Sequence, residues 1–477
     1  MRVLFVYPEP DVAPFYLQSP LGCLYLGAAL AQNHDVRIYD QNVDDQSLDD
    51  VVEEFDPQVI GVSFTTGCRL TALNLARKYK GTGRVLFAGG IHPTYMPEEC
   101  LEAGYDFVAL GEVEDTLSGF LDAVGKGGPP YLTNGYKVPA GYCYRAWNGD
   151  LVNTGIARST DINRWTPARY LLPKKYHRRY SHGVLMGSRG CVFACTFCAS
   201  ARTGFREREP RLIVDELEYI VNVEGHNAVH FADDIFTYKP KWVTAICKEI
   251  VARKLKCRWS INSRSDIPEN MWEMFDWMYE AGCEMVGFGI EAADQETLKR
   301  SGKGLKVGRI MPVLQRAREA GIGVKCNLMA GLPGATFEDH MMSVDMMEAV
   351  LPNQIVLSLT TPYPGTEMGN NPEKFGIRLK TENWTTLLQD VYLNAEKFDD
   401  VIEYDSITTD QIVEYVDALL SRMATYGYVR VSEDKVHAQR PEKVIKTFLD
   451  KPMLPRLRDE AGRIDVYNRT AEPNWAL

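Results

Sequence analysis

The chain has 477 residues, of which 45% are apolar and 25% charged, an ordinary composition for a globular protein with about three domains. A net charge of −11 argues against nucleic acid as the main partner, and no apolar stretch approaches the roughly 20 residues that span a bilayer. Eleven cysteines without a signal peptide predict a reducing, cytoplasmic setting, with metal-bound or free thiols rather than a disulfide framework.

Residues 1–126 alternate short apolar runs with amphipathic segments. The pattern predicts strands at 3–6, 36–39, 59–63, 85–88 and 107–110, and helices at 21–31, 48–55, 70–80, 97–103 and 116–126. Alternating strands and helices imply a doubly wound parallel sheet, so we expect a Rossmann-like α/β domain here. Ligands of such sheets bind beyond the carboxyl ends of the strands.

The loops after the third, fourth and fifth of these strands are candidate cofactor-binding segments. Paired glycines after the fourth strand let the backbone approach a ligand closely, and a glycine also follows the fifth strand. The candidate binding residues at the three strand ends are Ser63, Thr65, Gly89, Gly90, His92, Gly111 and Glu112. His92 has two interpretations, namely contact with a cofactor or local packing and hydrogen bonding.

Residues 127–182 are expected to form a connector. A Gly-Gly-Pro-Pro run at 127–130 breaks the helical pattern, and Asn-Gly pairs at 134–135 and 148–149 indicate turns between short β-like runs. Residues 174–179 are rich in basic side chains, which form either a solvated face or a basic rim that attracts an anionic substrate.

Three cysteines, Cys191, Cys195 and Cys198, stand in a CxxxCxxC pattern. Three thiolates this close cannot pair as disulfides without leaving one over, but they can converge on one soft metal centre. Four ligands would close an iron–sulfur site, whereas three leave one iron open to another ligand. A zinc site would want a fourth Cys or His at short spacing, and the next histidine, His226, lies 28 residues on.

The residues around and after the cysteines predict a second α/β unit. Strands are expected at 184–186, 229–234, 259–262, 285–291, 324–329 and 355–359, with helical stretches between them. Six parallel strands with polar carboxyl ends form a partial (β/α)6 barrel with its site at that face, as in full barrels. Residues that follow these strands include Asp233, Asp234, Arg264, Glu291, Gly331, Pro333 and the Pro-Tyr-Pro-Gly-Thr segment 362–366.

The cysteine loop resembles the cluster-binding loop of the radical S-adenosylmethionine (SAM) superfamily, and the later strand ends resemble that family in the same order. The resemblance implies a [4Fe–4S] cluster held by Cys191, Cys195 and Cys198, with its open iron chelated by SAM. An electron from the cluster would then cleave SAM to a 5′-deoxyadenosyl radical.

The same resemblance implies contacts to SAM from several strand ends. We expect Glu291 to meet the ammonium group of SAM and Arg264 to donate to its carboxylate. Gly331 and Pro333 lie in the Gly-Leu-Pro-Gly turn that supports SAM in the family, and the aromatic Phe197 suits the adenine region.

Residues 1–126, placed ahead of such a barrel, resemble the cobalamin-binding domain of the B12-dependent radical SAM class. In that class the nucleotide tail of cobalamin lies along these strand ends. The chain departs mildly from the family with Glu-Val-Glu at 112–114, where Glu-Gly-Glu is common. It also lacks the Asp-x-His-x-x-Gly motif whose histidine ligates cobalt in many B12 domains, so that histidine is not the lower ligand here.

The resemblance implies a cobalamin-dependent radical SAM methyltransferase acting on an unactivated carbon, or less often phosphorus, of a small molecule. One SAM would methylate cob(I)alamin, and a second would yield the radical that abstracts a substrate hydrogen. The substrate radical would take its methyl from methylcobalamin. Such an enzyme needs an external electron donor of the flavodoxin or ferredoxin type, and no side chain need act as nucleophile or general base.

Three alternatives remain open from the sequence. The same architecture serves cyclisation and ring rearrangement without methyl transfer. A methylthiotransferase would need a second cluster, but the cysteines before the triplet lack tight spacing; they are Cys23, Cys68, Cys100 and Cys143. A cobalamin carrier or sensor with an inactive barrel is the third, although the intact triplet speaks against it.

The predicted domain order is a cobalamin-binding domain at 1–126, a connector at 127–182, a radical SAM barrel at 183–366 and a mostly helical region at 367–477. In the last region, Thr408 to Asp410 cap a helix that runs to about Tyr426. The resemblance implies that this region helps to cover the barrel mouth and to shape the substrate site.

Overall fold

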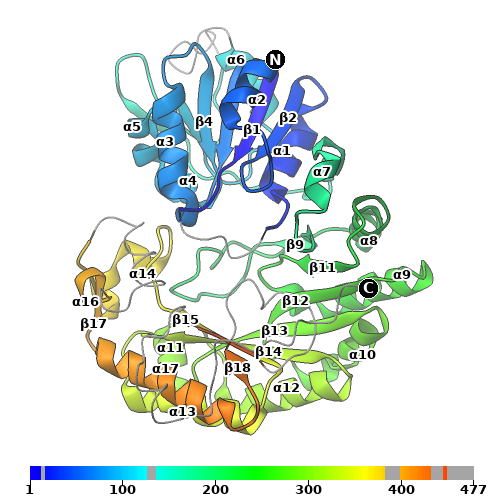
Figure 1. Cartoon of the computed structure of the whole chain (residues 1–477), viewed down its shortest axis with the longest axis vertical. Coiled ribbons are helices and arrows are strands. Elements are labelled where there is room, and N and C mark those ends of the chain that lie inside the picture. Colours follow the sequence, from blue (N-terminus) through cyan, green and yellow to red (C-terminus); the bar gives the residue numbers. More distant parts are fainter. Residues whose placement is uncertain (12–16, 126–135, 382–397, 431–443, 448–477) are drawn as a thin grey trace.

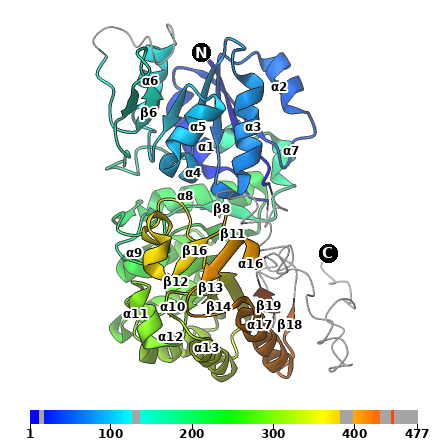
Figure 2. The same cartoon turned by 90° about the vertical axis from the view of Figure 1, so that its left-hand side faces the viewer.

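The computed structural model describes residues 1–11, 17–125, 136–381, 398–430 and 444–447. Two sheets are stacked along the long axis of the molecule, with the amino-terminal sheet at one end and the larger one at the other (Figures 1 and 2). The turn signals expected at 127–130 and 134–135, and the chain beyond 447, lie outside the described residues. The mixed α/β fold class expected from the sequence is confirmed.

The first sheet has five parallel strands in the order β2-β1-β3-β4-β5. Their bounds are Arg2–Tyr7 (β1), Asp35–Asp40 (β2), Val59–Ser63 (β3), Val85–Gly89 (β4) and Phe107–Ala109 (β5). All five strands were predicted to within two residues at each end. The strands are almost continuously apolar because a parallel sheet is covered on both faces.

Helices cover both faces of this sheet. They are α1 (Leu21–Leu30), α2 (Leu48–Phe55), α3 (Arg69–Tyr79), α4 (Ile91–Tyr95), α5 (Pro97–Ala103) and α6 (Leu117–Val124). Helices α2, α3 and α5 contribute to one buried apolar cluster, whereas α1 and α6 contribute to another. Ser47 starts α2 with a capping box, in which its side chain and that of Asp50 satisfy each other's backbone N–H groups.

Part of the expected connector belongs to this sheet. Strand β6 (Tyr142–Arg145) pairs antiparallel with β5, and β7 (Leu151–Asn153) pairs antiparallel with β6. The two strands cover an edge of the sheet that would otherwise be open. The chain then passes through η3 (Arg169–Leu171) and α7 (Lys174–His177) to the second sheet. The basic residues of α7 lie close to acidic ones of the first domain, as in the Lys175–Asp44 ion pair.

The second sheet contains the six predicted parallel strands in sequence order. They are β8 (Gly183–Leu185), β11 (Ala228–Phe231), β12 (Arg258–Arg264), β13 (Cys283–Glu291), β14 (Gly323–Ala330) and β15 (Gln354–Leu359). Two short parallel strands, β19 (Val444–Thr447) and β18 (Val429–Arg430), extend the sheet beyond β15. The carboxyl-terminal region therefore supplies strands as well as helices.

Helices follow most of these strands and form one continuous core with them. They are α8 (Pro210–Tyr219), η4 (Ile220–Glu224), η5 (Phe236–Tyr238), α9 (Pro240–Ala252), η6 (Glu269–Met271), α10 (Glu273–Glu280), α11 (Gln295–Arg300), η7 (Val307–Arg309), α12 (Ile310–Glu319) and α13 (Phe337–Val350). Thr336 begins α13 with a second capping box, directly after the Gly-Leu-Pro-Gly turn.

The described part of the region after 366 packs against the barrel. It comprises α14 (Glu367–Asn370), η8 (Pro372–Phe375), β16 (Ile377–Leu379), α16 (Phe398–Val401), β17 (Ile402–Tyr404) and α17 (Thr409–Ala424). The predicted helix start is confirmed, because Thr408 caps α17. Among the helices that the structure describes, none has the length and apolar character needed to cross a membrane.

Candidate functional site

The three triplet cysteines lie in a loop, residues 190–205, that a short hairpin closes at its base. Strand β9 (Ser188–Arg189) ends just before the loop, and strand β10 (Arg206–Glu207) begins just after it. The two strands are antiparallel, with Arg189 opposite Arg206. We call residues 190–205 the cluster loop.

Backbone hydrogen bonds hold the cluster loop in one conformation. The N–H of Thr203 donates to the carbonyl of Cys191 at 2.9 Å, and that of Arg202 donates to Phe193 at 2.8 Å. Gly190 has a positive φ of 80°, and a Cβ there would lie 2.1 Å from the carbonyl oxygen of Gly204. Only glycine fits this position without displacing the loop.

The predicted acidic pair after β11 supports the cluster loop from the barrel side. Asp233 is fully buried and accepts hydrogen bonds from the N–H of Gly187 and the hydroxyl of Ser188. Burial raises the pKa of Asp233 to about 7, although the hydrogen bonds from Ser188 and Gly187 act in the opposite direction. Asp234 accepts from the N–H of Gly190 at 3.1 Å and from the Ser200 hydroxyl at 2.7 Å.

Exposure separates the triplet from every other cysteine. Cys191, Cys195 and Cys198 are partly exposed, whereas the remaining eight are buried. Burial still raises the pKa of all three thiols, that of Cys198 to about 11. Each would therefore lose a proton when it binds iron, as thiolate ligands do.

The arrangement of these thiols fits an iron–sulfur cluster better than a single metal ion. Within the described residues, no three His, Cys, Asp or Glu side chains converge closely enough to hold one ion. In a [4Fe–4S] cluster each thiolate binds a different iron, so the sulfur atoms need not meet at one point. Three ligands and partial exposure leave one iron accessible to a further ligand.

Glu291 and Lys303 form a buried ion pair next to the cluster loop. The Lys303 ammonium lies 2.8 Å from a Glu291 carboxylate oxygen, and both side chains are at most 12% exposed. A Cβ on Gly289 would lie 2.6 Å from that carboxylate, so this glycine leaves room for the pair. The neighbouring Gly302 has a positive φ of 65° and approaches the Ala194 carbonyl of the cluster loop.

Arg264 is occupied by groups of the protein itself. It donates to both carboxylate oxygens of Asp266, at 3.0 and 2.7 Å, and to the backbone carbonyl of Lys303 at 2.8 Å. Its guanidinium also stacks over the Phe193 ring at 3.7 Å. Phe197, the other predicted residue of this region, is partly buried and packs against the barrel core. Arg264 thus contacts both the backbone at Lys303 and the cluster loop at Phe193.

Lys303 was not among the site residues predicted from the sequence, although the sequence around it carries a signal. Lysine stands between two glycines, Gly302 and Gly304, directly after α11, and both glycines have positive φ. A lone lysine in a glycine-rich loop is ambiguous until the fold brings it to the end of β13.

The Gly-Leu-Pro-Gly turn lies at the end of β14 and is held from two sides. Arg300 of α11 donates to the carbonyls of Pro333 and Gly334 at 3.0 and 2.9 Å. Gly331 has a positive φ of 73°, and the Tyr404 ring from β17 fills the space that a Cβ there would need. The region after 366 therefore contacts this turn directly.

On the first sheet, the predicted binding residues form a surface with few bulky side chains. Strands β3, β4 and β5 are neighbours, and their ends carry Ser63, Thr65, Gly90 and Gly111, which are exposed or half-buried; Gly89 lies buried before them. A Cβ on Gly90 would lie 2.6 Å from the Phe64 carbonyl, and its φ is 98°. Such a surface fits a large group lying along the strand ends.

His92 takes the local role that was one of its two interpretations. Its Nδ1 lies 3.1 Å from the Thr66 hydroxyl, and its Nε2 lies 3.0 Å from a Glu99 carboxylate oxygen. The residue is 1% exposed, and Arg69 also pairs with Glu99. Both ring nitrogens are thus occupied within the first domain.

Two contacts join the strand ends of the first sheet to the cluster loop. The carboxylate of Glu112 binds Arg189 and Arg206 at the base of the loop. The Tyr95 hydroxyl of α4 donates to the Ala199 carbonyl at 3.3 Å, next to Cys198. The predicted cobalamin-binding and cluster-binding segments therefore lie side by side in the structure.

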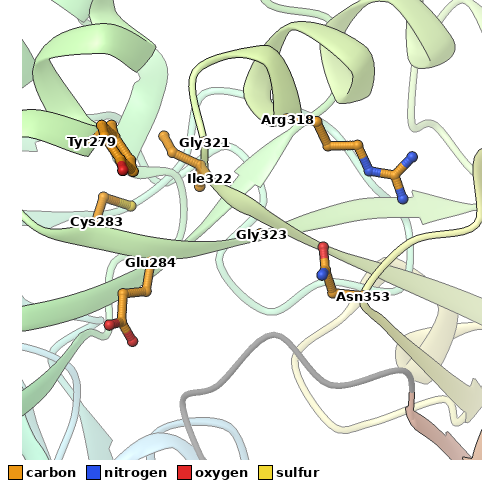
Figure 3. Close-up of a pocket in the computed structure, with 8 residues that line it drawn as sticks. All are labelled: Tyr279, Cys283, Glu284, Arg318, Gly321, Ile322, Gly323 and Asn353. Atoms are coloured by element: carbon orange, nitrogen blue, oxygen red, sulfur yellow. The ribbon is translucent and has the colours of Figure 1, made fainter.

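A separate pocket of about 450 Å³ lies at the amino-terminal ends of β13 and β14, lined in part by Tyr279, Cys283 and Glu284 (Figure 3). Its polar groups serve the fold: Arg318 donates to backbone carbonyls, and the Asn353 side chain accepts from the N–H of Val324. Barrel active sites occupy the opposite, carboxyl-terminal face, so this pocket is not a candidate catalytic site.

Comparisons with known families match both halves of this arrangement. Residues 185–347 match the Radical SAM superfamily, and residues 14–121 match the B12 binding domain. The first match runs from the end of β8 through the cluster loop into α13, and the second covers β2 to β5 with their strand-end loops.

Similar proteins span most of the chain. An uncharacterized methyltransferase from Pyrococcus horikoshii is 28% identical over 80% of this chain and 85% of its own length. The anaerobic magnesium-protoporphyrin IX monomethyl ester cyclase of Rubrivivax gelatinosus is 28% identical over 79% of this chain and 71% of its own. A structure of TsrM, a radical SAM methyltransferase from Kitasatospora setae, was solved with cobalamin and a [4Fe–4S] cluster bound. It superimposes on this chain with a TM-score of 0.65 at 20% sequence identity. The match covers 80% of this chain and 77% of TsrM.

Proposed function

Since the chain belongs to the cobalamin-dependent radical SAM enzymes, we propose that it is a methyltransferase acting on an unactivated carbon, or less often phosphorus, of a small molecule. When bound, the cluster supplies the electron that cleaves SAM to a 5′-deoxyadenosyl radical, and cobalamin supplies the methyl group that the substrate radical accepts. The observation that carries the proposal is the direct contact between the cluster loop and the strand ends of the cobalamin domain.

The residues of the barrel hold the cluster and SAM. Cys191, Cys195 and Cys198 ligate three irons, and their partial exposure supports an open fourth iron. Glu291 receives the ammonium group of SAM, while Lys303, rather than Arg264, donates to its carboxylate. The assignment of Lys303 in place of Arg264 is supported by the Glu291–Lys303 ion pair. Its negative carboxylate can bind the ammonium group of SAM, and its positive ammonium can bind the carboxylate of SAM.

The proposed function gives each predicted domain a role. Residues 1–126 hold cobalamin through Ser63, Thr65, Gly89, Gly90 and Gly111, whereas Glu112 and His92 act within the protein. The described part of the region after 366 covers the barrel mouth, a role supported by the contact of Tyr404 with the turn at Gly331. A protein of flavodoxin or ferredoxin type delivers the electron.

The decisive experiment follows both fates of SAM in one reaction. Anaerobic enzyme with reconstituted cluster and cobalamin is incubated with candidate substrates and methyl-deuterated SAM. We expect a product that carries the labelled methyl group, with one S-adenosylhomocysteine and one 5′-deoxyadenosine formed per turnover. Deoxyadenosine with an unlabelled product and no S-adenosylhomocysteine would rule out methyl transfer.

The cyclase from Rubrivivax gelatinosus favours a second candidate function. An oxidative cyclase or ring-rearranging enzyme would use the same cluster, SAM and cobalamin residues without transferring a methyl group. The labelling experiment separates the two functions, because cyclisation leaves the deuterated methyl group out of the product. The cysteines and Glu291 keep their roles in both.

A further inference from the structure

We propose that Glu112 is a positioning residue that clamps the base of the cluster loop to the cobalamin domain and thereby sets the distance between the two cofactors. This inference rests on the proposed function for its consequence, but its geometry involves only side chains of the chain itself.

The Glu112 carboxylate contacts both strands of the hairpin at once. Arg206 of β10 donates to its two oxygens, at 2.7 and 2.8 Å, and Arg189 of β9 donates at 3.1 Å. The N–H of Ser159 donates to the same carboxylate at 3.1 Å. A second carboxylate, Glu114, lies 2.8 Å from Arg189. Two acids of the first domain therefore neutralise two bases of the second.

These two arginines lie at the base of the cluster loop, where a change in the hairpin would change the orientation of the loop. Arg189 and Arg206 face each other across the β9–β10 pair, so the whole of residues 190–205 emerges between them. The loop is held internally by its own backbone hydrogen bonds. A small rotation of the hairpin would displace all three cysteines relative to the first sheet.

The clamp is only slightly exposed, which strengthens its electrostatic attraction. The side chains of Arg189, Arg206 and Glu112 are 13%, 20% and 19% exposed, and that of Glu114 is 7% exposed. Arg189 also stacks on the Tyr25 ring of α1 at 4.4 Å. Burial opposes ionisation of Glu112, but hydrogen bonds from Arg206 and the charges of both arginines bring its pKa below the ordinary value.

The opposite side of the hairpin is anchored to the barrel by Asp233 and Asp234. The hairpin therefore lies between two pairs of carboxylates, one from each domain. Removing the charge on the barrel side would disturb the barrel itself. Removing the charge of Glu112 should leave each domain folded and weaken only the contact between the first domain and the hairpin.

The test measures this contact directly in the full chain loaded with cluster and cobalamin. Pulsed dipolar EPR between the reduced cluster and cob(II)alamin should give one narrow distance in the wild type and a broadened or shifted distribution in Glu112→Gln. Hydrogen exchange of the cluster-loaded protein should be about tenfold faster at the loop base in this variant, because a partly buried charge loses its partner. Iron content should remain at the wild-type level.

The matched control is Glu207→Gln, which removes the exposed Glu207–Lys239 pair on the same β10 strand without touching the first domain. It should leave both readouts unchanged. Arg206→Lys, which keeps the charge but loses the bidentate geometry, should give an intermediate effect and serves if Glu112→Gln fails to fold.

Unchanged hydrogen exchange and an unchanged distance distribution in Glu112→Gln would overturn the proposal. Failure of the wild type to bind cobalamin would instead refute the proposed function. In that event the exchange measurement, which needs only the cluster, still decides whether Glu112 clamps the loop.

Discussion

The carboxyl ends of the strands carry different kinds of side chains in the two sheets. The ends of β3, β4 and β5 carry small residues and exposed glycine backbone. The ends of the barrel strands carry charges held in pairs, such as Arg264 with Asp266 and Glu291 with Lys303. A large flat cofactor needs space along a surface, whereas SAM presents an ammonium and a carboxylate that need opposite charges. The difference therefore indicates which cofactor each sheet holds.

Replacing any one cysteine of the triplet should have the largest effect and abolish the metal chemistry of the barrel. Cys191→Ala, Cys195→Ala and Cys198→Ala should each lose the near-400 nm absorption and about four irons per chain, because no described side chain can replace the ligand. Iron analysis and absorption spectra of anaerobic protein measure this. The buried Cys257→Ala is the control and should keep its iron. Stoichiometric zinc in the wild type would contradict the assignment.

Removing the charge of Glu291 should test whether the paired charges at the barrel strand ends bind SAM. Glu291→Gln leaves Lys303 without a carboxylate partner and would remove the charge-assisted hydrogen bond that we propose between Glu291 and the ammonium group of SAM, so we expect roughly 10- to 100-fold weaker SAM binding. Calorimetric titration of cluster-loaded protein measures it. Glu296→Gln, on the exposed surface of α11, is the control and should bind SAM normally. Equal affinities in both variants would remove Glu291 from the site.

Adding one methyl group to a strand-end glycine should test whether the small residues at the ends of β3, β4 and β5 leave space for cobalamin. Gly90→Ala would place Cβ 2.6 Å from the Phe64 carbonyl at a positive φ, so we expect about tenfold weaker cobalamin binding with iron content unchanged. Spectroscopic titration with cobalamin measures it. Gly81→Ala also has a positive φ but meets no atom within 4 Å, and its affinity should equal that of the wild type. Normal cobalamin binding by Gly90→Ala would show that this strand end is not used.

The buried Asp233 of the barrel should make the stability of the protein depend on pH. Its folded pKa of about 7 exceeds the ordinary 3.8, so the folded chain retains a proton that the unfolded chain releases between these values. The free energy of unfolding should therefore fall as pH rises from 5 to 7, by up to roughly 1.4 kcal/mol per pH unit.

Asp233→Asn removes the titrating carboxyl. The free energy of unfolding of the variant should therefore not show the fall between pH 5 and 7 that Asp233 causes in the wild type. Urea denaturation of cluster-free protein at several pH values measures the difference between the two chains. Parallel pH dependence of the wild type and the variant would mean that the carboxyl does not titrate in this range.

The sequence alone determined much of this protein. The alternation of apolar runs predicted five strands of the first sheet and six of the second, because buried parallel strands must be apolar and short. The spacing of Cys191, Cys195 and Cys198 predicted the cluster loop, because metal ligands so close in sequence need no tertiary contact to be recognised. The comparisons bear out both predicted domains, because residues 185–347 match the Radical SAM superfamily and residues 14–121 match the B12 binding domain.

Only the tertiary structure decided which charges meet. Lys303 lies 12 residues from Glu291, and Glu112 lies 94 residues from Arg206, yet each forms an ion pair with its partner. Arg264 was expected to contact SAM, and contact with a cofactor was one of two interpretations of His92. Both side chains have their polar groups bound to other residues of the protein. Such pairs depend on the directions of strands and loops that are distant in sequence, so periodicity and spacing do not show which charges meet.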